Sequence, residues 1–405
     1  MFRFLTAGES HGRALVAIVD GTPAGLRLSA ADLAQDLRRR QLGYGRGRRM
    51  AIEQDTADIL SGVRRGETIG SPIALLIHNR DWPNWQYTMS TETDPPADAG
   101  GAHRPDVTRP RPGHADLSGG LKYGRTDLRD ILERASARET AARVAVGAIA
   151  RAILKEIGIE IASHVTEIGD AALSSTIDVP FSAILQIQHD EGVRCVDAAC
   201  GDRMKQAIDR AREAGDTVGG SFEVVAHNVP AGLGSHVQWD RKLDGRIAQA
   251  MMSIPAIKAV GLGLATDVGH LPGSQVHDEI VRAGAGLDAG TLPGIARPTN
   301  RAGGLEGGVT NGQDVRVTAW MKPISTLMKP LRSVDLTTMS ESPATIERSD
   351  VCAVPAAAVV GEAMLAITLA EAVLEKFSSD TMGDLRAAWQ HYTAGLATRL
   401  AKGTA

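Results

Sequence analysis

The sequence predicts a fold that mixes helices and β-strands within one large domain, and two observations support this. First, short β-type runs alternate along the chain with longer segments whose apolar residues recur at helical spacing. Second, no stretch has the composition of a linker and no short-period repeat occurs. The 405 residues are therefore expected to form a single interwoven domain, 1–405, around one substantial core.

The individual elements follow from these patterns. A short apolar strand ends just before Gly8, and further strands are predicted over 15–20, 72–78, 220–227 and 315–320. Helices are predicted over 30–39, 127–157, 202–214 and 356–377. The longest irregular region, about 79–113, is rich in Pro and Gly and is expected to be a loop. Because so long a loop is usually functional, it suggests a lid or an active-site flap; a second irregular stretch covers 271–312.

Composition excludes several classes of protein. A net charge of −4 argues against a nucleic-acid or membrane-surface partner, because such binding needs a broad basic field. The three cysteines are odd in number and lack zinc-ligand spacing, so neither a disulfide framework nor a metal site is indicated. The N-terminus lacks the apolar core of a signal peptide, and acidic residues interrupt the apolar stretch 351–374. A cytoplasmic protein is expected.

Two arginine clusters suggest a pocket for anionic small molecules. The run 134–140, Arg-Ala-Ser-Ala-Arg-Glu-Thr, places two guanidiniums, two hydroxyls and a carboxylate within two turns of an apolar helical segment. The second cluster, 38–49, uses arginine and no lysine, which favours bidentate recognition of carboxylate and phosphate. A solvated basic face is the alternative for the second cluster.

Two histidines are candidates for acid–base chemistry. His11, in Gly-Glu-Ser-His-Gly, lies on a tight turn after the first strand, where a merely polar turn is the alternative. The chain has no Gly-x-Ser-x-Gly elbow, which argues against a serine nucleophile. Arg109 and Arg111 precede His114 and would disfavour its protonated form unless a bound anion compensates. An exposed loop histidine is the alternative there.

Three further segments carry polar groups. Residues 322–326, Lys-Pro-Ile-Ser-Thr, offer an ammonium and two hydroxyls as a phosphate cradle. The glycine pairs at 303–304 and 307–308 lack the spacing of a dinucleotide fingerprint but fit close approach of backbone to a flat ligand. Residues 348–350, Arg-Ser-Asp, precede the apolar C-terminal helix, where Ser349 or Asp350 is expected to cap it and Arg348 to be solvated.

Taken together, these segments resemble the chorismate synthase family over nearly the whole chain. The motifs that carry the resemblance are 8–12, 40–49, 111–124, 133–140, 300–312, 322–326 and 348–357. The resemblance implies an α+β fold of the β-α-β sandwich type, a homotetramer and reduced FMN as cofactor. It also implies conversion of 5-enolpyruvylshikimate 3-phosphate to chorismate by 1,4-anti elimination of phosphate, in the shikimate pathway of aromatic amino acid biosynthesis.

The resemblance also implies roles for individual residues. His11 would donate a proton to the leaving phosphate, His114 would protonate the flavin near N1, and Asp350 would act as a base through flavin N5. The implied substrate ligands are Arg40, Arg46, Arg49, Arg111, Arg138 and Arg348. The implied FMN contacts are Arg134, Ala135, Ser136, Pro255, Ala256, Gly307, Lys322, Pro323, Ile324, Ser325, Thr326 and Arg348.

One segment, 253–265, departs from the family's commoner pattern. Pro255 replaces an amide residue and offers no backbone N–H, and Gly261 replaces an acidic residue. We therefore predict somewhat weaker FMN binding than in relatives that carry the commoner residues.

Two alternatives to the family's activity stay open at this point. The same anion pocket fits a flavin-independent phosphate lyase or phosphatase, and it also fits a flavin- or metabolite-binding protein that has lost catalysis. Some members of the family reduce their own flavin with NADPH. Because this chain shows neither an added reductase domain nor a dinucleotide fingerprint, it is expected to depend on an external flavin reductant.

Overall fold

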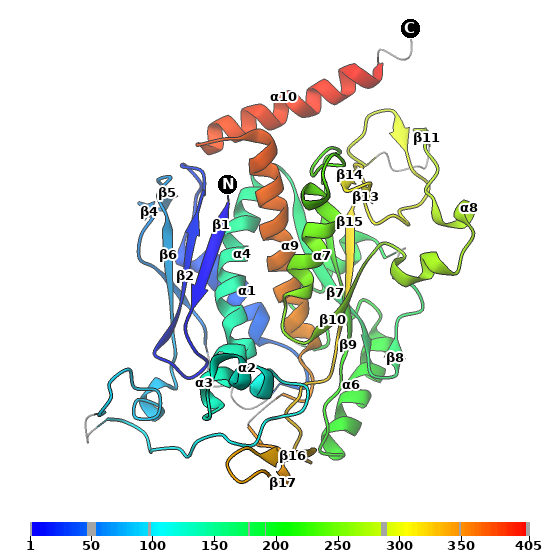
Figure 1. Cartoon of the computed structure of the whole chain (residues 1–405). Helices are drawn as coiled ribbons and strands as arrows, with labels where there is room; N and C mark the ends of the chain where they lie inside the picture. Colours follow the sequence, from blue (N-terminus) through cyan, green and yellow to red (C-terminus); the bar gives the residue numbers. More distant parts are fainter. Residues whose placement is uncertain are drawn as a thin grey trace.

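The computed structural model describes residues 2–46, 54–95, 99–176, 179–190, 192–284, 290–347 and 350–401. Two antiparallel sheets enclose a layer of helices (Figure 1). The strands are β1 Arg3–Ala7, β2 Ala14–Asp20, β3 Ala57–Ile59, β4 Val63–Arg64, β5 Glu67–Thr68, β6 Ile73–His78, β7 Glu160–Ile168, β8 Ala171–Ala172, β9 Gly220–His227, β10 Ile257–Leu262, β11 Val281–Arg282, β12 Ile295–Ala296, β13 Leu305–Glu306, β14 Val309–Thr310, β15 Val315–Met321, β16 Arg332–Asp335 and β17 Ser340–Pro343. The α-helices are α1 Ala30–Gln41, α2 Asp116–Tyr123, α3 Arg129–Ala135, α4 Thr140–Lys155, α5 Phe181–Gln186, α6 Ala198–Glu213, α7 Leu243–Met252, α8 Gly273–Val276, α9 Val354–Phe377 and α10 Met382–Ala401.

The first sheet has the strand order β1-β2-β6-β3 and the second the order β10-β15-β9-β7-β8. Along β6, alternate residues are buried, because one face of the first sheet packs on the helices. The second sheet is more deeply covered: β9 is buried over almost its whole length. This arrangement of sheet, helices and sheet is the expected β-α-β sandwich, so the fold class predicted from the sequence is confirmed.

The helix layer is built around α4 and α9, which pack against each other and each face one of the sheets. Gly147 permits the close approach of α4 to α9, and Gly361 permits that of α9 to β9. A Cβ at Gly147 would lie 2.3 Å from the Ala363 side chain, and one at Gly361 would lie 2.6 Å from the Phe222 ring. Since real Cβ atoms do not approach so closely, any larger residue at either position forces the layers apart.

The helix α9 is long and apolar enough to cross a membrane, by length and composition. However, 94% of its most apolar window is buried inside the protein, between α4, α7 and the second sheet. It is therefore a core helix, as its central position in Figure 1 shows.

One predicted helix is wrong in detail. The segment 127–157 is not continuous, because the backbone of Ser136 is extended and separates α3 from the short 3-10 turn Ala137–Glu139 and from α4. The Ser136 hydroxyl accepts a hydrogen bond from the Arg138 N–H, which stabilises the new helical start. Helical periodicity could not reveal this break, because the apolar spacing continues across it.

The other predicted strands and helices are confirmed within one to four residues at each end. The sequence analysis did not predict strands β7 and β10, helices α2, α5, α7 and α10, or the short strands β3, β4, β5, β8, β16 and β17. The 79–113 loop contains one short 3-10 turn, Trp82–Asn84, in the part that the structure describes. The region 271–312 is less irregular than expected, since it contains α8 and four two-residue strands.

Candidate functional site

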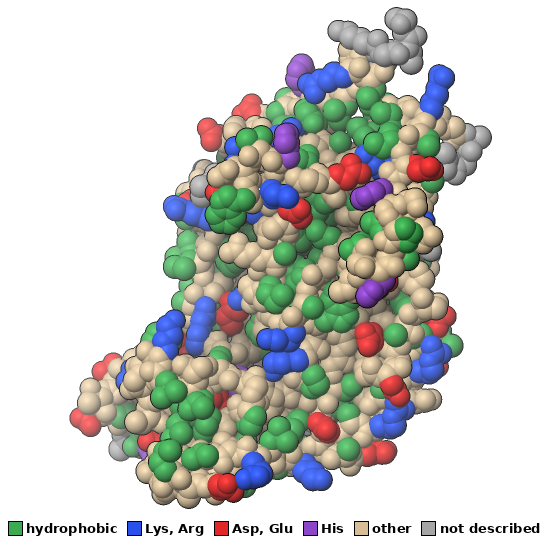
Figure 2. Space-filling model, turned by 45° about the vertical axis from the view of Figure 1, so that its right-hand side comes forward, with side chains coloured by type: hydrophobic (Ala, Val, Ile, Leu, Met, Phe, Trp, Pro, Cys, Tyr) green, Lys and Arg blue, Asp and Glu red, His purple; other side chains and the backbone are tan. Residues whose placement is uncertain are grey.

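The candidate site lies at the end of the sandwich where α4 and α9 both begin (Figure 1). A helix N-terminus carries partial positive charge and free N–H groups, so two of them at one place favour anions. Figure 2 shows Lys and Arg side chains around a recess in the lower half of its face.

His11 is fixed between a carboxylate and an indole. Its Nδ1 lies 2.9 and 3.0 Å from the two Glu133 carboxylate oxygens, and its backbone N–H donates to the same carboxylate at 2.8 Å. Its ring stacks on Trp85, with centroids 3.7 Å apart. Burial raises the pKa of Glu133, but hydrogen bonds and charge from His11, with a contribution from Arg129, outweigh it, and the net pKa is lowered.

His114 belongs to a second buried cluster. Its Nδ1 lies 2.5 Å from Asp116 Oδ1, and the Arg111 Nε donates to Asp116 Oδ2 at 2.8 Å. Another Arg111 nitrogen donates to the Thr326 hydroxyl at 3.0 Å. The pKa of Asp116 is lowered well below its usual range, because hydrogen bonds and charge from His114 and Arg111 exceed the opposing effect of burial.

The Lys322–Thr326 segment meets this second cluster. Lys322 Nζ donates to the Ser325 hydroxyl at 3.3 Å, and that hydroxyl donates to the Gly113 carbonyl at 3.3 Å. Burial lowers the pKa of Lys322, and the neighbouring ammonium of Lys258 lowers it further. Two ammonium groups that repel each other are stabilised by an anion between them, which fits the expected phosphate cradle.

Arg40 and Arg138 converge on one buried carboxylate. The Arg138 Nη1 donates to Asp55 Oδ1 at 2.7 Å, and Arg40 Nη1 lies 3.6 Å from the other Asp55 oxygen. Arg40 also donates to the Thr140 hydroxyl and to the Ala137 carbonyl, at 2.9 and 2.8 Å. These contacts fix both guanidiniums at the start of α4.

Arg46 pairs with Asp350 at 2.6 Å, beside the start of α9. Asp350 does not cap that helix, contrary to the expectation from its position, because the N-cap residue is Ala353 and no side chain bonds there. The predicted site residues Arg49 and Arg348, and the proposed cap Ser349, lie outside the described residues.

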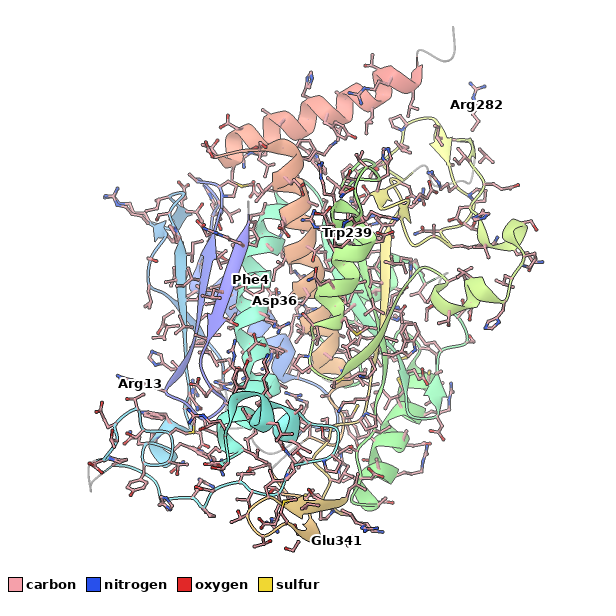
Figure 3. The ribbon with its side chains drawn as sticks, in the orientation of Figure 1. Phe4, Arg13, Asp36, Trp239, Arg282 and Glu341 are labelled. Carbon is pink, nitrogen blue, oxygen red and sulfur yellow. The ribbon has the colours of Figure 1, made fainter. Side chains whose placement is uncertain are left out.

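A cavity of about 470 Å³ lies between β1, the end of α3 and the start of α4. It is lined by Arg134, Ala135, Ser136 and Pro255 from the expected flavin contacts. Phe4, labelled in Figure 3, forms part of its wall from β1. Arg134 is fixed there by bonds to the Gly8 carbonyl at 3.0 Å and the Thr6 hydroxyl at 2.8 Å.

The segment that departs from the family pattern connects this cavity to Lys322. Ala256 has a positive φ of 67°, and its carbonyl accepts the Lys322 N–H at 2.9 Å. Gly261 lies outside the 470 Å³ cavity, and a Cβ there would come 2.3 Å from the Ala265 side chain. An acidic residue at 261 therefore does not fit this conformation of the chain.

Gly307, one of the expected FMN contacts, lies away from the histidine and arginine clusters described above. It lies in the turn between β13 and β14, facing His236. The seven residues of β15 separate this hairpin from Lys322, which corresponds to roughly 20 Å of strand. A larger cavity of about 930 Å³, lined by Trp320 and Ile280 among mainly apolar groups, also lies away from the clusters and contains none of the predicted site residues.

Sequence reasoning missed four partners of the candidate residues: Asp55, Trp85, Asp116 and Glu133. Asp116 follows His114 by two positions and Glu133 precedes Arg134, so a search for carboxylates beside basic motifs could have found both. Asp55 and Trp85 come from segments more than 70 residues away from Arg138 and His11 along the chain. No local pattern indicates such pairs.

Two sheets around a helix layer, with arginines and histidines gathered at one end, are features suited to a polyanionic small molecule. The family model described as chorismate synthase matches residues 2–374. A chorismate synthase of Geobacter sulfurreducens is 54% identical over 395 residues, covering 97% of this chain and 98% of that protein. One of Moorella thermoacetica is 58% identical over 381 residues, covering 94% and 95%. The chain therefore belongs to the chorismate synthase family.

The solved structures agree with this assignment. A structure titled "Crystal Structure of Chorismate Synthase" matches with a TM-score of 0.76 and 43% sequence identity, and covers 98% of each chain.

Proposed function

We propose that this protein is a lyase that forms chorismate from 5-enolpyruvylshikimate 3-phosphate by 1,4-anti elimination of phosphate, with reduced FMN and without net redox change. The observation that carries the proposal is a set of buried basic clusters at one end of the sandwich. Arg40 and Arg138 lie at the start of α4 and Arg46 beside the start of α9. His11 lies against α3, and Arg111 and His114 lie just before α2. Phosphate and two carboxylates on the substrate need several cations, and arginine forks match such groups.

The residues present fit both ligands. The 470 Å³ cavity is within the range of small-molecule sites and is bordered by cationic and hydroxyl groups. Gly113 lies beside the Lys322 ammonium with a φ of +78°, a conformation that favours glycine, and its carbonyl accepts the Ser325 hydroxyl. We assign the flavin contacts within one subunit to 134–136, 255–256 and 322–326, with Arg348 as a further candidate.

Gly307 is left out of the contacts made within one subunit, because of its distance along β15. In the expected homotetramer, it could reach a flavin only from a neighbouring copy. We therefore propose the homotetramer and the flavin contact of Gly307 together. Sedimentation of the parent protein tests the tetramer, and FMN titration of Gly307→Ala tests the contact.

The protein's residues would act as follows. Arg40, Arg46, Arg111 and Arg138, joined by Arg49 and Arg348, would bind the substrate anions and neutralise the leaving phosphate. His11, oriented by Glu133, would donate its Nε2 proton to that phosphate. His114 would hold a proton toward the flavin, and Asp350, beside Arg46, would accept the proton released in the elimination. When bound, reduced FMN supplies electron density transiently to the breaking C–O bond.

An anaerobic assay tests this function. Chorismate should form from 5-enolpyruvylshikimate 3-phosphate with photoreduced FMN and should not form with oxidised FMN or without flavin. The variants His114→Ala and Asp350→Ala should each lose about 100-fold or more in kcat, since positioned acids and bases contribute that much. Phosphate release that needs no flavin would instead favour a simple phosphate lyase or phosphatase.

We further propose a cytoplasmic enzyme that takes its reduced flavin from an external source. Incubation of the protein with oxidised FMN, substrate and NADPH under nitrogen should give no chorismate. Sustained formation under those conditions would contradict the dependence on an external reductant.

A further inference from the structure

The two catalytic histidines are each bonded to a carboxylate that the function described above does not use. We propose that Glu133 and Asp116 are positioning residues, which hold Nδ1–H of His11 and His114 and so direct Nε2 of each ring to the ligands. The inference rests on the proposed function, because it assumes that both histidines move protons.

Glu133 orients His11 from several directions. Its carboxylate accepts from both the ring nitrogen Nδ1 and the backbone N–H of His11, and its own carbonyl accepts the N–H of Ser10 at 2.9 Å. The Glu133 side chain has no exposed surface, while 12% of the His11 side chain is exposed. The ring is therefore fixed on its buried edge, and Trp85 fixes its plane.

Asp116 also contacts Nδ1 of His114, but here the Arg111 guanidinium lies against the ring as well, with its Nη2 3.0 Å from Nδ1 and 3.4 Å from Nε2. One carboxylate oxygen contacts His114 Nδ1 at 2.5 Å, and the carboxylate also accepts from the Arg111 guanidinium and from the Arg111 backbone N–H, at 2.8 to 3.1 Å. The Asp116 side chain is fully buried and 18% of the His114 side chain is exposed. An ionised carboxylate can accept all of these bonds at once.

Proton transfer by His11 and His114 requires that Nδ1 of each ring is held by a carboxylate. A carboxylate on Nδ1 selects the tautomer in which Nδ1 carries hydrogen, and it stabilises the imidazolium through its negative charge. Both carboxyl groups have lowered pKa values, as described above, so they are ionised near neutral pH. Arg129 faces Glu133, Arg104 lies over Trp85, and Arg111 and Lys322 face the His114 cluster. These cations oppose the imidazolium forms, which makes the two carboxylates necessary.

Three other histidine–carboxylate pairs in the described part of the chain differ from these two. His227 Nδ1 lies 2.7 Å from Asp314, but His227 ends β9 at the end opposite Gly220, the residue that pairs with Met321 beside Lys322. His164 bonds Glu223 through Nε2 and is fully buried in the second sheet, so it has no nitrogen directed to a site. His78 and Asp58 lie 3.3 Å apart on the surface, with 62% and 57% of their side chains exposed. The surface pair is joined through Nε2 and serves as the control for removing a carboxylate from a histidine that does not contact the site.

The test measures kcat, KM and the pH dependence of kcat for Asp116→Asn, Glu133→Gln and the control Asp58→Asn. We expect kcat to fall about 100-fold in each site variant, since general acid catalysis contributes 10²–10⁴-fold, while KM changes less than threefold. We also expect the alkaline limb of the kcat profile to move to lower pH by about one unit, because a neutral amide stabilises the imidazolium less. Asp116→Glu and Glu133→Asp, which keep the charge, should recover part of kcat and the parental limb. Asp58→Asn should behave as the parent.

A parental kcat and pH limb in both amide variants would overturn the inference, provided that His11→Ala and His114→Ala are impaired. Equal losses in the amide variants and in the charge-retaining variants, without movement of the limb, would also overturn it, since that pattern indicates a structural role. If the parent itself forms no chorismate, the proposed function fails instead. Should Asp116→Asn not fold after Arg111 loses its partner, the Glu133 variants decide the matter.

Discussion

Arg39 and Arg40 are neighbours on α1, and both are almost completely buried, yet they serve different regions of the molecule. Arg39 donates to both oxygens of Glu362 at 2.8 and 2.7 Å and to Asp36 at 2.7 Å, in the middle of the helix layer, where Figure 3 labels Asp36. Arg40 points to the start of α4 and the candidate site. Consecutive side chains on a helix point about 100° apart, so one step along the sequence changes the partner.

The Arg39 region is a closed ion network. Glu362 has no exposed surface and is shared by Arg39, Arg151 and Arg194. Burial raises the pKa of Glu362, but the three guanidiniums lower it to about 2. The Arg40 region differs because Arg40 and Arg138 lie at the start of α4, and Arg46 lies beside the start of α9. One arginine cluster in the sequence therefore divides, in the structure, between a closed ion network and the proposed ligand site.

The largest expected effect is on stability. Glu362→Gln keeps the shape of the side chain but leaves Arg39, Arg151 and Arg194 without their shared buried carboxylate, with Asp36 as the remaining partner of the first two, so the free energy of unfolding should fall by about 3–5 kcal/mol. Urea denaturation measures this. The exposed pair of Arg332 and Glu341 is the control, and Glu341→Gln should change stability by less than about 1 kcal/mol. A loss below 1 kcal/mol for Glu362→Gln would remove the distinction between the two regions.

The second prediction distinguishes the role of Arg40 in catalysis from the role of Arg39 in stability. Arg40→Lys keeps the charge but loses the guanidinium fork, so kcat/KM should fall roughly 10- to 100-fold, as expected for charged hydrogen bonds. Arg39→Lys should lower the free energy of unfolding and leave kcat/KM of the folded enzyme within about threefold. Steady-state kinetics and urea melts of both variants check this. Equal catalytic losses in the two variants would contradict the assignment.

The third prediction concerns the free energy of unfolding at acidic pH. The folded pKa of Glu362 lies below its ordinary value of 4.5, so its contribution to stability is present above pH 4.5 and is lost as pH falls toward 2. The parent should lose about 2–3 kcal/mol from this group over that interval, and Glu362→Gln should lose correspondingly less. Urea melts at pH 6, 4 and 3 measure the difference. Parallel pH profiles for the two proteins would show that Glu362 does not have this role.

The smallest effect is on the cofactor. Pro255 borders the cavity and has neither a backbone N–H nor an amide side chain. Pro255→Asn should tighten FMN binding by about 2- to 10-fold, the value of one added hydrogen bond, with little change in stability. Fluorescence titration of FMN gives the affinity. An unchanged or weaker affinity would remove the argument from the 253–265 segment.

The sequence predicted most of the fold, because strands and helices that face one core carry clear apolar periodicity, as in β9 and α9. It could not predict the break at Ser136, which depends on a local hydrogen bond, or the pairing of Asp55 with Arg138, which joins distant segments. The sequence analysis also placed Arg39 and Arg40 in one cluster, because their different partners come from distant segments of the chain. Residue type and spacing indicate an anion pocket, but only long-range contacts show which arginines belong to it.

The central claim is that substrate and flavin meet at the starts of α4 and α9. A crystal structure of the complex with oxidised FMN and 5-enolpyruvylshikimate 3-phosphate tests it most directly. The account predicts the substrate phosphate within hydrogen-bond distance of His11, with Arg40, Arg111 and Arg138 around the anions and the flavin against 134–136 and 322–326. Finding both ligands in the larger cavity beside Trp320 and Ile280 would contradict it.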